Sequence, residues 1–137
     1  MKEYACALLV DDGHLLLGKR APYRKTYASK WDVIGGCIEQ GETREAALHR
    51  ELQEEIAIVP QAAQWFATLS DPDVTPEDPP LYHFFRLERW SGTPGINNHE
   101  HTELAWIPLQ QCGSWPDLAR PEYPALFARL ADFYSRQ

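Results

Sequence analysis

Three glutamates at helical spacing are the residues of this chain best suited to chemistry. Glu51 and Glu55 are four positions apart, and Glu54 lies between them. On a helix, residues three and four positions apart are neighbours, so these carboxylates would project from one side. Like charges so placed destabilise an exposed helix by about 0.3 kcal/mol per pair. Because magnesium binds convergent oxygens of this kind, the pattern indicates either a metal site or a solvated acidic face.

A helix that begins near Thr43 would present these acids. The hydroxyl of Thr43 can cap the first free amide groups of the helix. Leu48, Leu52 and Ile56 then recur every four residues and form an apolar stripe that can pack on a sheet. The spacing therefore predicts an amphipathic helix with its acids beside the packed face.

Glycines stand just before this helix, at positions 35, 36 and 41. Glycine adopts positive φ angles and lets the backbone approach a ligand closely. A plain surface helix needs neither property ahead of its first turn. We therefore expect residues 35–58 to form a glycine-rich loop that leads into the acidic helix.

The same stretch carries a longer pattern of fixed positions, which are Gly36, Glu42, Arg50, Glu51, Leu52, Glu54, Glu55, Ala57 and Ile58. This pattern resembles the signature box of the Nudix hydrolases, which has glycine where Ala57 stands. Glycine suits a helix-ending residue with positive φ. Alanine in that conformation costs about 1 kcal/mol, unless the helix continues further. We expect Ala57 to tune the protein without abolishing activity.

The resemblance implies hydrolysis of a phosphoanhydride in a nucleoside diphosphate joined to another group, with Mg²⁺ as cofactor and Mn²⁺ as an alternative. It also implies the metal ligands, which are Glu51, Glu54, Glu55 and the backbone carbonyl of Gly35. Divalent ions would shield the phosphate oxygens and lower the pKa of bound water.

Further residues are expected to support or complete this site. The guanidinium of Arg50 can hold a glutamate for metal binding, and Glu42 is the expected partner, so we assign Arg50, Glu42 and Gly36 to the support of the catalytic glutamates. The general base differs among members of the resembling family. The candidates here are Glu51, Glu100 and Glu103.

Two histidines, His99 and His101, flank Glu100. In an extended chain both would lie on one side, which would suit a transition metal. Surface histidines with no cysteine or third histidine nearby are more often solvated, and that is the alternative.

Substrate contacts are expected from two further segments. Trp115 and Asp117 are similar to the C-terminal region of oxidised purine nucleoside triphosphatases of the MutT type, where a tryptophan stacks on the base and an aspartate reads its edge. Leu118 does not match a second reading aspartate, and Trp115 can instead cover the core. The basic segment that starts at Arg20 and ends at Lys30 either approaches substrate phosphates or serves solubility.

These features favour a nucleoside triphosphate, normal or oxidised, as the substrate that is cut to a monophosphate and pyrophosphate. Two alternatives stay open. One is the same chemistry on a nucleotide sugar, a dinucleoside polyphosphate or a dinucleotide cofactor. The other is a module that binds a nucleotide as a sensor without cleaving it.

Length and composition limit the number of domains, the partners and the location that we expect. A chain of 137 residues fits one domain over residues 1–137, which the resemblance makes a single Nudix domain. The net charge of −7 argues against polymeric nucleic acid as a partner. No apolar run approaches the roughly 20 residues needed to span a membrane, and residues 1–4 lack the apolar core of a secretory signal, so we expect a cytoplasmic location. The resemblance implies a monomer or a homodimer. Cys6, Cys37 and Cys112 are expected to be reduced thiols.

Strands and helices alternate along the chain. The pattern indicates a β-hairpin over residues 4–19 with its turn at Asp12-Gly13. It predicts further strands at 31–34, 62–69, 81–90 and 104–107, loops at 71–80 and 91–98, and a final packing helix at 121–137. This is an α/β pattern, and the resemblance implies an α/β/α sandwich around a mixed β-sheet.

Overall fold

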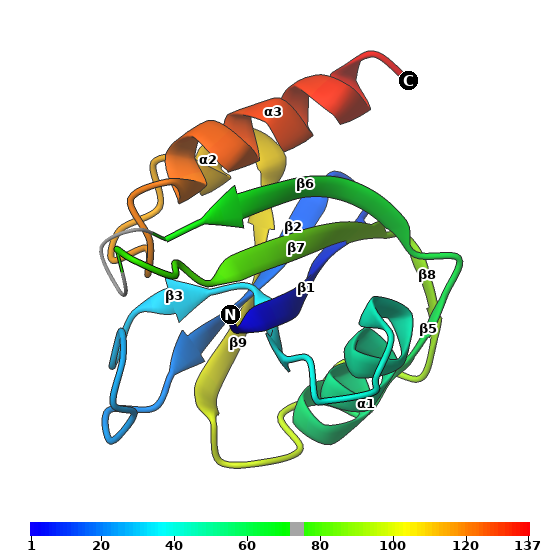
Figure 1. Ribbon diagram of the computed structural model, residues 1–137. Coiled ribbons are helices and arrows are strands. Elements are labelled where there is room, and N and C mark those ends of the chain that lie inside the picture. The colour runs from blue at the N-terminus through cyan, green and yellow to red at the C-terminus, as the bar shows by residue number, and fades with distance from the viewer. Residues whose placement is uncertain (72–75) are drawn as a thin grey trace.

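The computed structural model describes residues 1–71 and 76–137, and in it a mixed sheet lies between helix α1 on one face and helices α2 and α3 on the other (Figure 1). This confirms the expected α/β class and its sandwich architecture. The elements in chain order are β1 (Glu3–Asp11), β2 (His14–Arg20), β3 (Trp31–Asp32), β4 (Ile34–Cys37), α1 (Arg44–Ile56), β5 (Val59–Gln61), β6 (Gln64–Ser70), β7 (Leu81–Leu87), β8 (Arg89–Ser91), β9 (His101–Pro108), α2 (Leu109–Cys112) and α3 (Tyr123–Ser135).

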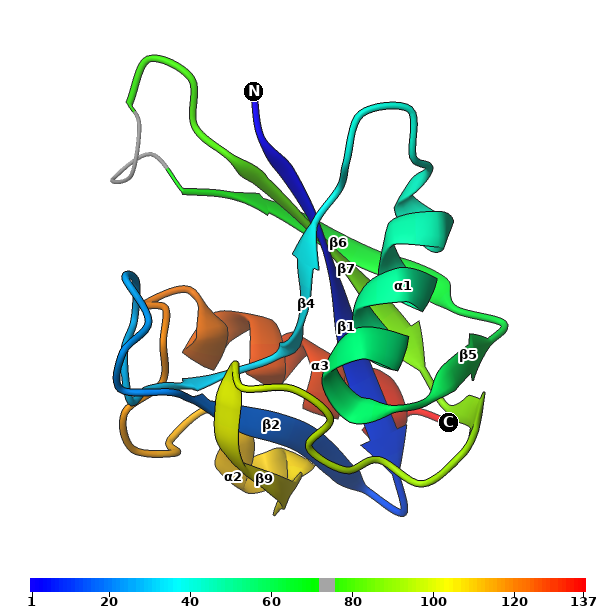
Figure 2. The ribbon, with the colours of Figure 1, turned by 90° about the horizontal axis from the view of Figure 1, so that it is seen from below.

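Strand β1 lies at the centre of the sheet. The strand order is β3-β2-β1-β7-β6, with β4 paired to β1 and β9 paired to β2. The β1–β7 pairing is parallel and the others are antiparallel, so the sheet is mixed. Strands β5 and β8 form a separate pair near the C-terminal end of α1 (Figure 2).

The side chains of β1 alternate between two cores, because successive residues of a strand point to opposite faces. One core contains Cys6, Leu8 and Val10 together with Leu126, Phe127 and Leu130 of α3. The other contains Ala5, Ala7 and Leu9 together with Leu48, Leu52 and Ile56 of α1. The predicted apolar stripe of the acidic helix is therefore buried against the sheet.

The hairpin and the start of α1 follow the sequence-based predictions. Asp12 and Gly13 have φ angles of 48° and 72°, as a two-residue turn with two left-handed positions requires. Thr43 caps α1, and its Oγ1 accepts a hydrogen bond of 3.1 Å from the backbone N–H of Ala46.

Helix α1 ends in the left-handed conformation at Ala57, whose φ and ψ are 61° and 39°. The N–H of Ala57 donates to the carbonyl oxygen of Gln53 at 3.2 Å. Of the two predicted outcomes, a strained helix end or a longer helix, the structure therefore has the strained end.

The glycines before α1 differ in part from the prediction. Gly41 has a φ of 81°, as expected for a turn. Gly35 and Gly36 instead lie in β4, which pairs antiparallel with β1, so the predicted loop is partly a strand. Neither glycine has a positive φ, and the reason for their small size is close packing, described below.

Other boundaries also shifted. The strand expected at 62–69 is β6, which starts only at Gln64 because Ala62, with a φ of 53°, separates it from β5. The strand expected at 81–90 is divided into β7 and β8. Strand β9 starts earlier than predicted, at His101, and the short helix α2 was not predicted. In the loop predicted at 71–80, residues 72–75 lie outside the described residues.

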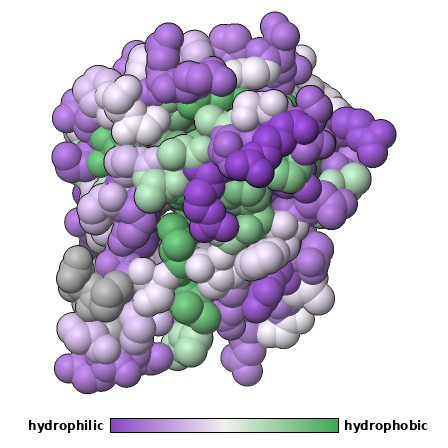
Figure 3. All heavy atoms as spheres, turned by 90° about the horizontal axis from the view of Figure 1, so that it is seen from above, coloured by the Kyte–Doolittle hydropathy of each residue, from purple (hydrophilic) through white to green (hydrophobic). Residues whose placement is uncertain are grey.

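The face that carries α3 shows hydrophilic side chains around apolar residues that remain visible between them (Figure 3). Within residues 1–71 and 76–137, no helix is both long enough and apolar enough to cross a membrane. The three cysteines are free thiols, as predicted, with Cys6 and Cys112 buried.

Candidate active site

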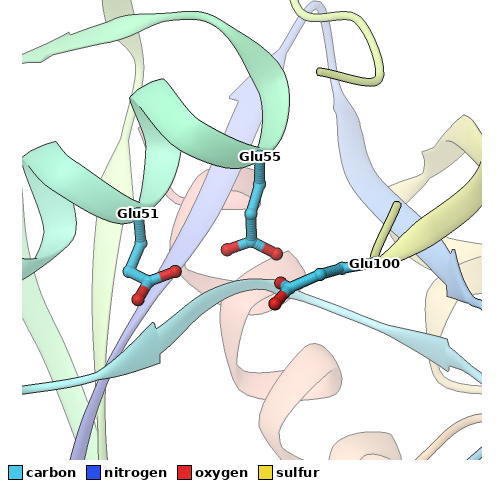
Figure 4. Close-up of side chains that lie close together, drawn as sticks. All are labelled: Glu51, Glu55 and Glu100. Carbon is cyan, nitrogen blue, oxygen red and sulfur yellow. The ribbon is translucent and has the colours of Figure 1, made fainter. Parts of the chain in front are cut away.

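Glu51, Glu55 and Glu100 form a group of convergent carboxylates, called the acidic cluster below (Figure 4). One oxygen from each residue lies within 4.8 Å of the others. Glu51 and Glu55 project from consecutive turns of α1, and Glu100 comes from the residue before β9. So many carboxylates at short range are unfavourable when all are ionised, unless a cation lies among them.

The segment between β8 and β9 passes beside α1 (Figure 2) and carries Glu100 to the helix (Figure 4). This segment runs along the C-terminal end of the helix, where the N–H of Gly95 donates to the carbonyl of Ile56 at 3.1 Å and that of Asn97 to the carbonyl of Glu55 at 2.9 Å. These bonds satisfy carbonyls that the helix itself leaves free. The end of α1 thus positions the third acid.

Burial gives the acidic cluster its unusual electrostatics. The side chain of Glu55 is 2% exposed, and its Oε2 is buried without a hydrogen-bond partner within the described residues. Burial, reinforced by Glu100 and Glu51, raises the pKa of Glu55 well above its ordinary value. Burial also raises the pKa of Glu51, although Arg50 opposes the shift. A divalent cation would complete this group, because it would offset both the burial and the repulsion of the carboxylates.

Arg50 forms hydrogen bonds both with Glu42, which precedes α1, and with Glu51 of the acidic cluster. Its Nε and Nη2 donate to the two oxygens of Glu42 at 2.8 and 3.0 Å, and its Nη1 donates to Glu51 at 2.9 Å. Its Nη2 also donates to the carbonyl of Cys37 at 3.0 Å. The Arg50 guanidinium, together with the N–H of Glu39, lowers the pKa of Glu42 to about 2. The guanidinium therefore holds Glu51 from one side while Glu42 balances its charge.

Two glycines of β4 make room for these contacts. A β-carbon on Gly36 would lie 2.2 Å from the carboxyl carbon of Glu51, and one on Gly35 would lie 2.2 Å from the backbone oxygen of Ala5. Any larger residue at position 36 would displace the Glu51 carboxylate. The sequence had suggested close approach to a ligand; the close neighbours are Glu51 and strand β1.

Glu54 does not belong to the acidic cluster in this structure. Its side chain is 56% exposed and lies 3.6 Å from the guanidinium of Arg50. Successive helical residues turn by about 100°, so Glu54 projects well away from Glu55 while Glu51 and Glu55 nearly align. Its role as a metal ligand stays a prediction.

The acidic cluster lines a cleft of about 920 Å³. Two predicted phosphate-binding cations also line it. Arg20 lies 3.3 Å from the carboxylate of Asp32, and Arg24 lies 3.7 Å from that of Glu100. Lys25 and Lys30 of the same basic segment are exposed and outside the cleft lining. The segment therefore contributes its arginines, and not its lysines, to the cleft.

A second group, called the tyrosine–arginine cluster below, consists of Tyr4, Tyr27, Tyr82 and Arg120, which also line the cleft. The rings of Tyr4 and Tyr82 stack at 4.6 Å, and the Arg120 guanidinium lies 3.5 Å from the centre of the Tyr82 ring. Arg120 is buried and donates to the buried carboxylate of Asp71 at 3.0 Å. These contacts hold the tyrosine rings and the guanidinium against one another.

The tyrosine–arginine cluster was not predicted from the sequence, because its members come from four distant parts of the chain. Tyr4 and Tyr82 are direct partners in the parallel β1–β7 register. Predicting that these two residues are neighbours requires knowing that β1 pairs with β7. Hydrophobic alternation indicates where strands are, but it does not indicate which strands pair.

Trp115 and Asp117, predicted to bind the base, lie outside the cleft lining. The indole of Trp115 packs edge-on against Trp31, with ring centres 6.1 Å apart, and borders the core on the α3 face. The carbonyl of Asp117 accepts a hydrogen bond from the N–H of Trp31 at 2.8 Å. The structure therefore gives Trp115 the packing role that the sequence had left open, because the loop after α2 is held to β3.

The two histidines around Glu100 have opposite environments, which corrects the expectation that they share one side. His99 is exposed, whereas the ring of His101 is buried beside Glu55. Burial lowers the pKa of His101. Glu103, one of the three base candidates, lies 3.7 Å from Lys19 and outside the cleft lining.

Comparison with known proteins identifies the family. The NUDIX domain model matches residues 2–130, so the chain belongs to the Nudix family. The structure of a MutT NUDIX hydrolase from Burkholderia pseudomallei superimposes with a TM-score of 0.82 at 24% sequence identity, covering 94% of this chain and 97% of that one.

Curated relatives refine the class. The chain is 31% identical to the CTP pyrophosphohydrolase of Escherichia coli K12 over 131 residues, which is 96% of this chain and 93% of that protein. It is 43% identical to the 8-oxo-dGTP diphosphatase of the same strain over 91 residues, or 66% of this chain and 60% of that protein. The protein is a MutT-like Nudix hydrolase, an enzyme that acts on anhydride bonds of nucleotide derivatives.

Proposed function

We propose that this enzyme hydrolyses a nucleoside triphosphate, normal or oxidised, to a monophosphate and pyrophosphate with the help of a divalent metal. The observation that carries the proposal is the single cleft, which joins the acidic cluster to the tyrosine–arginine cluster. The former suits a metal-bound phosphate chain and the latter suits a base. Relatives named for CTP and 8-oxo-dGTP support a triphosphate.

The metal we propose is Mg²⁺, with Mn²⁺ as an alternative. Glu51, Glu55 and Glu100 would hold it, and the carbonyl of Gly35 and the side chain of Glu54 are further candidates. The donor set consists of hard oxygens, and the unpartnered Oε2 of Glu55 is a buried acceptor suited to a cation. When bound, such ions shield phosphate oxygens and acidify water.

The chain's own side chains would perform the remaining tasks. Arg50, braced by Glu42, keeps Glu51 directed into the cleft. Arg20 and Arg24 are the cations placed to contact phosphate oxygens, where charge-assisted hydrogen bonds are strongest. Glu100, the most exposed member of the acidic cluster, is our candidate for the general base, with Glu51 as the other candidate.

The tyrosine–arginine cluster would hold the base. Stacking of a base on an aromatic ring contributes roughly 1–3 kcal/mol and tolerates different bases. A rigid ring surface with an arginine beside it would thus bind the nucleoside while the acidic cluster acts on the phosphates.

A substrate panel tests the proposal. Phosphate and pyrophosphate release would be measured with Mg²⁺ on nucleoside triphosphates including 8-oxo-dGTP, nucleotide sugars, dinucleoside polyphosphates and dinucleotide cofactors. We expect turnover of triphosphates that collapses in Glu55→Gln and persists in Glu45→Gln, which changes an exposed glutamate of the same helix. Turnover confined to another substrate class contradicts the triphosphate assignment. Nucleotide binding with no turnover on the whole panel favours the sensor alternative.

We further propose that the chain works as one domain over residues 1–137, in the cytoplasm, as a monomer or homodimer. Its partners would be small nucleotides and neither polymeric nucleic acid nor membranes. The net charge of −7 supports the exclusion of polymeric nucleic acid, because nucleic-acid backbones attract basic surfaces.

A further inference from the structure

His101 is a buried polar side chain in the cleft to which the proposed reaction gives no task. Its ring is 4% exposed, and its Nδ1 lies 3.6 Å from Oε1 of Glu55. Among the described residues, neither His101 Nδ1 nor Glu55 Oε2 has a hydrogen-bond partner. Two neighbouring buried side chains that each carry an unpartnered polar atom are uncommon in protein interiors, where nearly all buried polar atoms are paired.

The ring of His101 packs directly against a glycine of strand β2. Gly18 lies inside strand β2 and has no positive φ, so turn geometry does not explain it. A β-carbon on Gly18 would lie 2.6 Å from Cδ2 of His101 and 3.0 Å from Cδ1 of Ile34. Glycine in a strand interior weakens the strand and often marks a close approach. The approaching group here is the imidazole of His101.

An imidazole Nδ1 that carries a proton is a hydrogen-bond donor, and in the neutral ring the partner of each nitrogen decides where the proton resides. The carboxylate oxygen beside Nδ1 is Oε1 of Glu55, at 3.6 Å.

We propose that His101 is a positioning residue, whose Nδ1–H forms a hydrogen bond with the Glu55 carboxylate once their 3.6 Å separation shortens by a few tenths of an ångström, and that this bond keeps the carboxylate directed toward Glu51 and Glu100. Glutamate loses considerable side-chain freedom when it is fixed, so a preset direction lowers the cost of binding a cation. Groups that orient metal ligands in this way typically change metal affinity or activity by roughly 10- to 100-fold when removed. This inference rests on the proposed metal-dependent function.

Three substitutions of His101 distinguish the effect of its hydrogen-bond donor from the effect of its packing. His101→Leu fills the space without a donor, whereas His101→Asn places an amide N–H near the position of Nδ1. His101→Gln carries the same amide one methylene further out and is the matched control. Urea unfolding would establish that each variant is folded.

The first measurement is the affinity for Mn²⁺ without substrate, from the free-ion signal in electron paramagnetic resonance. We expect His101→Leu to bind Mn²⁺ roughly 10- to 100-fold more weakly, His101→Asn to recover most of the affinity, and His101→Gln to recover little. The second measurement is kcat and KM, where we expect kcat to follow the Mn²⁺ affinity and KM for the nucleotide to change little.

Two results would overturn the inference while leaving the proposed function intact. The first is an unchanged Mn²⁺ affinity in His101→Leu when the unmodified enzyme binds Mn²⁺ and hydrolyses triphosphates. The second is an equal loss in His101→Asn and His101→Leu, which would show that packing of the ring matters and its donor does not. If the unmodified chain neither binds Mn²⁺ nor turns over any nucleotide, the proposed function fails, and this inference with it.

Discussion

The acidic cluster and the tyrosine–arginine cluster share one cleft but are stabilised in opposite ways. In the tyrosine–arginine cluster the buried charge is already balanced, since Arg120 is paired with Asp71 and covers Tyr82. In the acidic cluster the carboxylates repel one another, and one buried oxygen has no partner. The buried charge of one region is balanced within the protein, whereas the carboxylates of the other would be balanced by a bound cation. The difference separates a cluster that the fold alone satisfies from one with room for a ligand of opposite charge.

The strongest way to break the acidic cluster is Glu55→Gln. The amide keeps the size of the side chain but cannot serve as a charged metal ligand, and metal-based stabilisation of the transition state is worth several kcal/mol. We expect kcat to fall by about 10³-fold, which corresponds to about 4 kcal/mol. Steady-state kinetics with Mg²⁺ measures the effect, with Glu45→Gln as the matched control. A variant that keeps more than a tenth of the activity would remove Glu55 from the proposed site.

The tyrosine–arginine cluster is tested with Tyr82→Leu. Loss of the ring removes the stack on Tyr4 and the contact with Arg120, so nucleoside binding should weaken while the phosphate chemistry is untouched. We expect KM to rise roughly tenfold with kcat nearly unchanged, in line with the 1–3 kcal/mol of a base stack. Tyr82→Phe keeps the ring and should resemble the unmodified enzyme. A fall in kcat at constant KM would assign Tyr82 to the chemistry.

The raised pKa of Glu55 in the acidic cluster predicts how the free energy of unfolding of the metal-free protein depends on pH. Without metal, the folded-state pKa of Glu55 lies above its ordinary value of 4.5. The stability linked to this group is therefore fully present below pH 4.5 and is lost as pH rises through the raised pKa, by at most about 1.4 kcal/mol per pH unit. Between pH 5 and 8, urea unfolding of the metal-free protein should show Glu55→Gln gaining stability relative to the unmodified chain. A difference that stays constant over this range would contradict the raised pKa.

The smallest effect is expected away from both clusters, at the end of α1. Ala57 has a φ of 61°, which glycine adopts without steric cost, so Ala57→Gly should stabilise the protein by about 0.5 kcal/mol after the entropy of glycine is subtracted. The midpoint of urea unfolding measures the gain, and kcat should not change. Ala46→Gly, in the first turn of the same helix, should instead lower stability. A loss of stability in Ala57→Gly would mean that the left-handed conformation costs less than we infer.

Features that depend on residues close together in the sequence were predicted, and features that depend on contacts between distant segments were not. Thr43, the apolar stripe and the acids of α1 lie within one helix, so spacing alone placed them. Glu100 was a candidate because the family resemblance pointed to a loop acid. Tyr27 and Arg120 were not predicted, because they reach the cleft through pairings between distant segments.

Where prediction failed in detail, tertiary packing had overridden the local pattern. Gly35 and Gly36 signalled a loop but form part of a strand, since β1 needs a partner with no side chain in the way. Trp115 matched both a base-binding pattern and a packing role, and its ring packs on Trp31; base binding by Trp115 and Asp117 stays a prediction. The type of a residue limits the roles that it can have, and its contacts in the folded protein determine which of these roles it has.

The central position of β1 has a consequence for the order of assembly during synthesis. Its parallel neighbour β7 pairs Glu3 with Leu81, so most of the chain must leave the ribosome before the middle of the sheet can close. Parallel pairing over such a separation is slow, and an open strand edge invites contact with other chains. The apolar run of β1, which is buried on both faces in the folded enzyme, is thus the segment of the nascent chain that most needs protection.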